Sequence, residues 1–464
     1  MHQECVATES WIRPASIGAQ AVVVGAGIAG IAAARVLADW FETVILLERD
    51  FLHDAPTYRT GTPQARHPHV LLLGGQRALQ ELFPALDSDF IAAGSVPLQV
   101  NRDLREELPD GRRIPQRDLG LTCFALTRPR LEYMLRQRLA QQPNIIIQDG
   151  TRVVDLLAEP NGRRIKAIRC EGVTDNRSHI LPADLVVDAS GRGQLTVGYL
   201  MATGRPFQQT EINIDIGYST AVLDVPEDVS RDWKAVITHN KAPYLSRRAV
   251  ILPIEGNRWL MTALGYRDDH PPADWSAILS FLQHLTTRTI YDAVSKLRPK
   301  DRVARFGLPA SVWRHFEGVA DFPDNLLPIG DAICRFNPAY GQGMSVAAKE
   351  AALLRRVLAT YAPAPDPFSG LSRAFLREVG SFIETPWTMA ALPDLAFPEV
   401  RGERPADLNR SLAFQHALMR LAGHDEEVQR LRTEVWHMLK PPSVLRAPEI
   451  ARRVEAEMAE TVYA

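Results

Sequence analysis

The sequence predicts an α/β fold built from two or three packed units, and three observations point to it. The chain has 464 residues, which is more than one ordinary hydrophobic core accommodates. A β-branched run at 21–24 leads through a glycine-rich turn into an Ala-rich segment and then to a second apolar run at 44–47, which is a βαβ pattern. Segments of alternating polarity follow between about 207 and 308, which favours an antiparallel sheet in a second unit.

The composition is that of a soluble globular protein, because 46% of the residues are apolar and 23% are charged. The net charge of −2 gives no electrostatic reason to expect a nucleic-acid partner. Residues 1–20 hold no apolar block, and no run is long enough for a transmembrane segment. The cysteines are too far apart for a disulfide framework or a zinc site, so we expect a cytoplasmic location; they are Cys5, Cys123, Cys170 and Cys334.

The first local signal is Gly25-Ala26-Gly27-Ile28-Ala29-Gly30, between the strand at 21–24 and a helix expected over 28–40. In such a turn Gly25 permits the tight bend, Gly27 lets a pyrophosphate approach the backbone, and Gly30 lets helix and strand pack closely. The N–H groups and the positive dipole end of the helix then hold the phosphates. Glu48, at the end of the second strand, can accept hydrogen bonds from ribose hydroxyls. This unit predicts a Rossmann-type dinucleotide site.

The remaining elements follow from local patterns. Asp110-Gly111 predicts a hairpin within 104–114, and a helix is expected from Arg130 to about Gln141. Buried strands are expected at 145–147 and 185–187. In the second unit we expect a period-2 strand over 211–218 and a hairpin from 249–253 into 258–266, and further helices over 345–358, 412–422 and 426–439.

A second glycine-rich turn lies some 300 residues after the first. Gly330-Asp331 ends a strand, and Asn337-Pro338-Ala339-Tyr340-Gly341-Gln342-Gly343-Met344 opens an Ala-rich helix. Here the sequence resembles the FAD-dependent monooxygenases of the para-hydroxybenzoate hydroxylase type. The resemblance implies that Asp331 binds the ribityl chain and that the Gly341–Met344 backbone faces the pyrimidine end of the flavin. A helix N-terminus there would stabilise the negative charge that reduced flavin carries near N1 and C2=O.

Between the two turns stands Asp188-Ala189-Ser190-Gly191, where hydroxylases of this type carry an Asp-Gly motif linked to FAD and NAD(P)H. Ser190 replaces the acid of that motif. Two routes for electrons therefore stay open, which are direct reduction by NADH or NADPH and supply through a separate flavin reductase. Asp188 can contact the cofactor or act as a capping residue.

A finer resemblance comes from Arg59-Thr60-Gly61-Thr62-Pro63-Gln64-Ala65-Arg66-His67-Pro68-His69, Thr127-Arg128 and the surroundings of Trp387. These stretches are similar to the bacterial polyene epoxidases of polyether-antibiotic pathways. The resemblance implies that Arg128 reaches the FAD chain and that Arg59 and Arg66 lie near the flavin, as guanidinium donors suit. The full set expected to bind the cofactor is Gly25, Gly27, Ala29, Gly30, Glu48, Arg49, Arg59, Arg66, Arg128, Val153, Asp331, Gly341, Gly343 and Met344.

Two further groups of side chains have alternative interpretations. Tyr218, Trp259 and Tyr340 could line a substrate cavity, although aromatic residues at such positions also serve as plain core. His67 and His69 would lie on one side of a strand, as metal ligands can, but no third ligand is apparent, so no metal site is predicted.

The expected organisation is a Rossmann-type FAD-binding domain in two parts, 18–206 and 318–364, with an antiparallel-sheet substrate domain at 207–317 and a helical C-terminal region at 365–464. The expected activity is that of an FAD-dependent monooxygenase, which uses O2 through a flavin C4a-hydroperoxide. By resemblance, it would epoxidise or hydroxylate a hydrophobic polyketide or terpenoid alkene of secondary metabolism, as in antibiotic biosynthesis.

Three alternatives remain at this point. A flavin halogenase shares the fold, but its Trp-x-Trp-x-Ile-Pro signature does not occur in the chain. A flavin-dependent alkene reductase, similar to geranylgeranyl reductases, could also carry Asp-Ala-Ser-Gly. A non-catalytic FAD-binding sensor would bind the cofactor without oxidising a substrate. The helix start at Gly341 argues against such a sensor, which has less need to stabilise reduced flavin.

Overall fold

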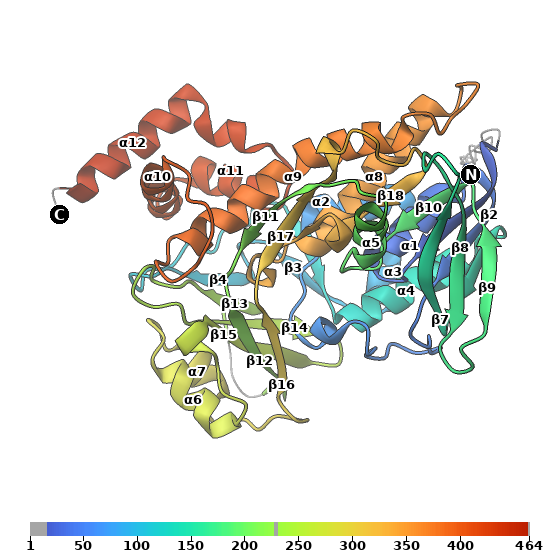
Figure 1. Ribbon diagram of the computed structural model, residues 1–464. Coiled ribbons are helices and arrows are strands. Elements are labelled where there is room, and N and C mark those ends of the chain that lie inside the picture. The colour runs from blue at the N-terminus through green and yellow to red at the C-terminus, as the bar shows by residue number, and fades with distance from the viewer. Residues whose placement is uncertain (1–15, 227–230, 463–464) are drawn as a thin grey trace, which may run out of the picture.

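The structure, a computed structural model, describes residues 16–226 and 231–462, and a five-stranded parallel sheet forms its first unit, at the right of Figure 1. The strand order is β18-β10-β1-β2-β6. The strands are β1 (Gly18–Val24), β2 (Phe41–Leu47), β6 (Ile145–Gln148), β10 (Leu185–Asp188) and β18 (Leu326–Pro328). The Val, Ile and Leu side chains of β1, β2, β10 and β18 are buried on both faces, as parallel strands require, whereas Ile146 of the edge strand β6 is 52% exposed. The strands expected at 21–24, 44–47 and 185–187 are confirmed. The strand expected at 145–147 is present, but it is not buried as expected, because β6 lies at the edge of the sheet.

Helices flank this sheet, and two of them begin at the predicted glycine turns. These two are α1 (Ile28–Leu37) and α8 (Gly343–Tyr361), and the others are α2 (Leu73–Leu82), α3 (Leu86–Ala92), α4 (Arg128–Ala140) and α5 (Gln194–Ala202). Helix α1 ends at Leu37, three residues before the expected end, because the chain must turn at once to enter β2 at Phe41. The Phe41 ring is buried and stacks on Phe368, so this residue belongs to the strand.

A six-stranded sheet forms the second unit, with the order β16-β12-β15-β14-β13-β4. Its strands are β4 (Leu104–Glu107), β12 (Ile216–Asp224), β13 (Ala235–Thr238), β14 (Arg248–Ile254), β15 (Arg258–Tyr266) and β16 (Ala304–Leu308). All neighbours are antiparallel except β13 and β4. The hairpin expected from 249–253 into 258–266 is confirmed as β14–β15. Strand β4 joins this sheet although it precedes the predicted substrate domain in sequence.

The two faces of the six-stranded sheet have different neighbours. Helices α6 (Trp275–Gln283) and α7 (Thr289–Val294) cover one face, which we call the outer face, and pack with Ala221 and Ala263. The opposite, inner face carries Tyr218 and Leu264 and belongs to the large core shared with the five-stranded sheet. Because side chains alternate along a strand, each position between 216 and 224 can be assigned to one face.

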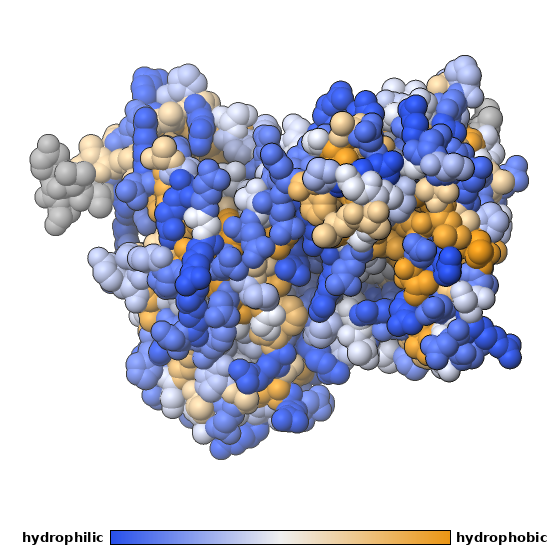
Figure 2. All heavy atoms as spheres, viewed as in Figure 1, coloured by the Kyte–Doolittle hydropathy of each residue, from blue (hydrophilic) through white to orange (hydrophobic). Residues whose placement is uncertain are grey.

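Three smaller sheets complete the β structure. They are β7 (Thr151–Ala158) with β8 (Ile165–Gly172) and β9 (Ser178–Pro182), β11 (Gln208–Ile212) with β17 (Ser311–His315) and β19 (Cys334–Arg335), and β3 (Val96–Gln99) with β5 (Thr122–Ala125). The period-2 segment at 211–218 is divided between β11 and β12, because Asp215 has a positive φ of 42°. Hydrophobic residues reach the surface at the end of the molecule that holds the β7–β9 sheet (Figure 2), where Ile180 is exposed.

The C-terminal region is helical, as expected, with α9 (Leu371–Leu395), α10 (Leu408–Leu421), α11 (Glu426–Trp436) and α12 (Pro448–Val462). Helix α9 packs into the large core, and its Trp387 lies against Trp313 of β17. The last three helices build a separate hydrophobic cluster at the far left of Figure 1. Within the described ranges, no helix is long and apolar enough to cross a membrane. Cys123, Cys170 and Cys334 are buried free thiols, and Cys5 lies outside the described residues.

Candidate functional site

The first glycine turn is built so tightly that two of its glycines cannot carry a side chain. Gly25 has a φ of +104°, and a Cβ there would lie 2.5 Å from the Ala189 carbonyl oxygen. A Cβ on Gly30 would lie 1.8 Å from the carbonyl oxygen of Gly25. These contacts bring the start of α1 against the end of β1, as the pattern predicts.

Gly27 is different, because its missing side chain leaves room. A Cβ at Gly27 would have as nearest neighbours Arg128 Nη2 at 3.8 Å and Glu132 Oε1 at 3.9 Å. Gly27 is also the N-cap of α1, and no side chain caps this helix terminus. The uncapped N–H groups and the guanidinium of Arg128 therefore face the same space, which suits an anionic group.

A buried network of charges lies beside this turn. Glu48 Oε2 accepts hydrogen bonds from the Ala26 N–H at 2.9 Å and from Arg59 Nη1 at 2.8 Å. Arg59 Nη2 also donates to Glu132 at 2.5 Å, and Arg128 Nε donates to Glu132 at 2.9 Å. Burial would raise the pKa of Glu132, but Arg128 and Arg59 hold it below the ordinary value, so Glu132 is ionised. Arg59 therefore orients Glu48 and Glu132, and its expected contact with the cofactor stays a prediction.

The second glycine turn meets the first across α1 and α8. Gly330 has a φ of +66°, and a Cβ there would lie 3.0 Å from Ala29 Cβ. The Asp331 carboxylate lies 3.9 Å from the position of a Cβ on Gly343, at the start of α8. Burial raises the pKa of Asp331, and the charge of Arg128 opposes this shift. Arg128 therefore lies beside Gly27, and its charge also acts on Asp331.

Helix α8 has 19 residues, and no side chain caps its N-terminus. Gly341, just before it, has a φ of +68°. Gln342 is 1% exposed, yet neither its amide nitrogen nor its amide oxygen has a hydrogen-bond partner in the described part of the chain. A buried amide without partners costs free energy unless a ligand satisfies it. The turn therefore fits the polar edge of a flavin ring, and Met344 follows in the first turn of the helix.

The motif Asp188-Ala189-Ser190-Gly191, between the two glycine turns, has a structural role in its own loop. Asp188 is fully buried, and its two oxygens accept hydrogen bonds from the backbone N–H and the hydroxyl of both Ser190 and Thr196. Four donors saturate a carboxylate, so Asp188 serves the start of α5. Of the two interpretations of Asp188, the structure supports capping.

The other residues expected near the cofactor are more dispersed. The Arg49 side chain is 62% exposed and lies beside Asp50. Arg66 stacks over the Tyr58 ring at 4.4 Å. Val153 is half-buried in β7, opposite Cys170. Their expected contacts with the cofactor stay predictions.

On the inner face of the six-stranded sheet, the structure joins residues from three parts of the chain. Tyr218 OH donates to Asn337 Oδ1 at 3.1 Å. Tyr266 OH and Tyr340 OH donate to the Asp394 carboxylate of α9 at 2.6 and 2.8 Å. Tyr218 and Tyr340 thus meet at the second glycine turn, as their joint assignment to one cavity would require.

Trp259 does not join this group. It lies on the outer face, in the cluster formed with α6 and α7, where it stacks on Trp233 with ring centroids 5.5 Å apart. It is an odd number of residues from Tyr266 along β15, so the pleat directs it to the opposite side of the sheet. The structure therefore places Trp259 in the core rather than with Tyr218 and Tyr340.

Sequence reasoning did not single out Asp394, Tyr266 or Arg248. Asp394 is fully buried, and burial raises its pKa to about 6 while hydrogen bonds from Tyr266, Tyr340 and Asn337 oppose the shift. Burial and the charge of Asp394 raise the pKa of Tyr266 and Tyr340 well above the usual value. The only sequence signals were a charged residue opening the apolar strand 248–254 and an acid after Pro393 in a helix.

The two histidines expected on one side of a strand have separate roles. His67 Nδ1 lies 2.6 Å from the Thr220 hydroxyl on the inner face. His69 Nδ1 donates to the His67 carbonyl at 2.8 Å, and its Nε2 faces Arg128 Nη1 at 3.4 Å. Burial lowers the pKa of His67 to about 4 and that of His69 to about 3, so both rings are neutral. Among the described residues, no cluster of three or more metal-ligating side chains occurs.

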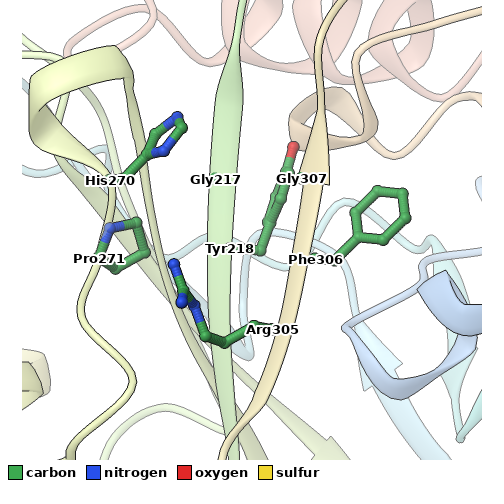
Figure 3. A pocket seen from close by; sticks show the side chains of 7 residues that line it. All are labelled: Gly217, Tyr218, His270, Pro271, Arg305, Phe306 and Gly307. Carbon is green, nitrogen blue, oxygen red and sulfur yellow. The ribbon is translucent and has the colours of Figure 1, made fainter.

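Two cavities border the six-stranded sheet. One of about 210 Å³ is lined by His270, Pro271, Arg305, Tyr218 and Phe306, together with the strand glycines Gly217 and Gly307 (Figure 3). The other, of about 170 Å³, lies on the inner face, with Thr220 and Val222 on the sheet and Tyr58 and Arg66 on the loop that carries His67. The second cavity is the one that borders the unit with the five-stranded sheet.

Comparisons with known proteins support this assignment of the fold. No family model matches the chain. Over 402 residues, which are 82% of this chain and 81% of the relative, the sequence is 32% identical to Protein Rv3254 of Mycobacterium tuberculosis.

Solved structures share the fold at low sequence identity. A flavoprotein/dehydrogenase from Cytophaga hutchinsonii has a TM-score of 0.68 at 12% identity, over 96% of this chain and 100% of that one. The flavin-dependent brominase Bmp2 has a TM-score of 0.64 at 16% identity, over 92% and 97%. PqsL of Pseudomonas aeruginosa, a probable FAD-dependent monooxygenase, has a TM-score of 0.59 at 16% identity, over 82% and 98%. The predicted fold class, that of FAD-binding α/β enzymes, is confirmed.

Proposed function

We propose that this chain, which belongs to the same family as Protein Rv3254 of Mycobacterium tuberculosis, is an FAD-dependent monooxygenase. One observation carries the proposal. Two glycine turns some 300 residues apart each open a helix whose N-terminus no side chain caps, and the two segments meet where Gly330, just before the second turn, packs against Ala29 of the first. A ligand that engages both turns must be long and must carry negative charge between its two ends, which describes FAD.

Each part of the site has a matching part of the cofactor. The Gly27 backbone and the start of α1 would hold the pyrophosphate, and Glu48 would accept hydrogen bonds from the adenosine ribose. Arg128 and Asp331 lie where the chain between phosphates and ring would pass. The Gly341–Met344 backbone, with the partnerless Gln342 amide, would hold the pyrimidine edge of the ring. When bound, FAD would supply activation of O2 and transfer of one oxygen atom.

The protein's own contribution is a dry, shaped surface beside the ring. The inner face presents Tyr218, Leu264 and Phe306 toward the second turn, and the first two are buried. Exclusion of water protects a reactive oxygen donor from hydrolysis and side reactions. An apolar alkene or aromatic substrate suits this wall. The resemblance to polyene epoxidases supports a polyketide or terpenoid alkene, which would be epoxidised or hydroxylated.

The source of electrons is proposed to be a separate flavin reductase that uses NADH or NADPH. Ser190 stands in place of the acid that links FAD and nicotinamide in the hydroxylases, and Asp188 is saturated by its own loop. Both observations support a partner reductase over direct reduction.

A halogenase is the main rival, because Bmp2 has the same fold. The missing Trp-x-Trp-x-Ile-Pro signature supports a monooxygenase. The fold alone does not separate the two activities.

The decisive experiment uses purified protein reconstituted with FAD. Bleaching of the flavin absorbance is followed under anaerobic conditions with NADH or NADPH, first alone and then with a flavin reductase. Reduced protein is then mixed with O2 and a terpenoid alkene, with and without bromide. We expect bleaching only with the reductase and an oxygenated product that does not depend on bromide. A protein that stays colourless after reconstitution would overturn the proposal, and a brominated product would replace it with a halogenase.

A further inference from the structure

Arg248 is a buried cation that forms no ion pair with any of the residues that the structure describes. It opens β14 and is 5% exposed. Its Nε donates to the Thr238 carbonyl at 3.2 Å, and this is the only hydrogen bond that the guanidinium makes in the described part of the chain. No carboxylate of the described residues lies within the 4 Å of an ion pair. Among the described residues, neither terminal nitrogen has an acceptor, although together they carry four N–H donors.

The side chain lies in the row of residues that faces the second glycine turn. Arg248 pairs with Leu264 of β15, and Leu264 pairs in turn with Tyr218 of β12. Tyr218 pairs with Phe306 of β16, so these four residues occupy one level of the inner face. The guanidinium lies 5.8 Å from the centroid of the Tyr340 ring. Arg248 is therefore one side chain away from the turn that opens α8.

The neighbouring carboxylates are engaged elsewhere. The charge of Arg248 lowers the pKa of Asp394. The oxygens of Asp394, however, already accept hydrogen bonds from Tyr266, Tyr340 and Asn337. Glu106, farther along the inner face, is bound by His239 and Arg432. Removing an unpaired charge from water is expensive, so a protein retains one where a ligand completes it.

We propose that Arg248 binds a carboxylate of the substrate through its two terminal nitrogens. The ligand would be an apolar molecule with one carboxylate, because the rest of the row consists of Leu264, Tyr218 and Phe306. Planar, bidentate pairing with a carboxylate is the arrangement that a guanidinium favours. This inference rests on the proposed function and narrows it, since the anchored end would hold the apolar part of the substrate beside the Gly341–Met344 backbone.

Binding can be measured without turnover. Oxidised, FAD-loaded protein is titrated by calorimetry with geranate and with geranamide, which has the same skeleton but no charge. We expect geranate to bind about 10- to 100-fold more tightly, as hydrogen bonds to a charged group imply. Arg248→Met should abolish this preference, and Arg248→Lys should retain part of it. Arg305→Met, on the outer face of the adjacent sheet edge, should bind both ligands like the parent protein.

Urea unfolding in the absence of ligand distinguishes two roles of Arg248, which are binding a ligand and stabilising the fold. If Arg248 awaits a ligand, Arg248→Met removes an unpaired buried charge and should unfold at the same urea concentration as the parent or a higher one. Geranate should then raise the midpoint of the parent protein but not of Arg248→Met. A variant that unfolds earlier yet still prefers geranate would overturn the inference. Equal affinity for the two ligands, or no binding of geranate at millimolar concentration, would do so as well.

These outcomes are distinct from failure of the proposed function. A protein that keeps its FAD but does not distinguish acid from amide refutes the role of Arg248 alone. If the protein cannot be loaded with FAD, the same titration is carried out on the protein without cofactor, and a preference for the acid there refutes the monooxygenase proposal alone.

Discussion

The side-chain amide of Asn337 donates to both oxygens of the Asp394 carboxylate, at 2.9 and 3.1 Å. Asn337 begins the second glycine turn, and Asp394 lies near the end of α9. The same carboxylate accepts hydrogen bonds from Tyr266 of the six-stranded sheet and from Tyr340 of the turn. One buried acid therefore fixes the turn against both the inner face and the C-terminal region.

Replacing Asp394 with Ala should destabilise the protein strongly. Three buried donors would lose their acceptor, and such groups cannot reach water instead. We expect a loss of about 3–5 kcal/mol in the free energy of unfolding, measured by urea denaturation. Asp394→Asn keeps one acceptor oxygen and should lose about half as much. Equal stability of parent and Asp394→Ala would contradict the assigned role.

Glu350 should make the protein less stable as the pH rises. It is fully buried in α8, accepts from the Gly330 N–H at 2.5 Å, and burial raises its pKa from 4.5 to about 8. The folded state keeps a proton that the unfolded state releases, so this contribution is complete below pH 4.5 and is lost as the pH rises toward 8.

Glu350→Gln tests this directly, because the glutamine retains an acceptor for Gly330 but has no charge. We expect the variant to be more stable than the parent at pH 8, by a few kcal/mol (about 1.4 per pKa unit), and equally stable near pH 4.5. Unfolding curves at several pH values measure the difference. The pKa of Asp394 is raised as well, but only to about 6, so Asp394 does not change the stability further above pH 6. If the stabilities of the parent and of Glu350→Gln changed in parallel above pH 6, the pH dependence assigned to Glu350 would be refuted.

Two alanine substitutions in the first turn should behave differently. Gly30→Ala places a Cβ 1.8 Å from a carbonyl oxygen and should prevent correct folding. Gly27→Ala has no protein atom nearer than 3.8 Å, so it should fold with nearly unchanged stability. Its methyl group would nevertheless occupy the space proposed for the pyrophosphate. We expect Gly27→Ala to be colourless but folded, as judged by circular dichroism and flavin absorbance. Retention of FAD by Gly27→Ala would argue against this site.

Asp331→Ala should weaken FAD retention without weakening the fold. Burial raises the pKa of Asp331, so the carboxylate costs the empty protein free energy and its removal should not lower stability. We expect the dissociation constant for FAD, from flavin fluorescence, to rise about 10- to 100-fold, as loss of a charged hydrogen bond implies. An unchanged constant would remove Asp331 from the site.

Much of the unit around the five-stranded sheet could be predicted from the sequence, because its constraints are local. Gly25 and Gly30 are required by contacts within one turn, and the runs at 21–24 and 44–47 are recognisable as strands buried on both faces. The second turn at Gly341–Met344 is readable in the same way, since a positive φ and a helix start leave a short signature.

The inner face of the six-stranded sheet was decided only by the tertiary structure. Whether Tyr218 and Trp259 share a face depends on strand register, and the hydrogen bonds to Asp394 come from residues 54 to 128 positions away. No spacing records such pairings, because they arise when the sheet, the second turn and α9 pack together. The sequence by itself therefore determined the glycine turns, where a phosphate-bearing ligand could approach the backbone. Packing of the tertiary structure determined which side chains of the inner face lie beside these turns.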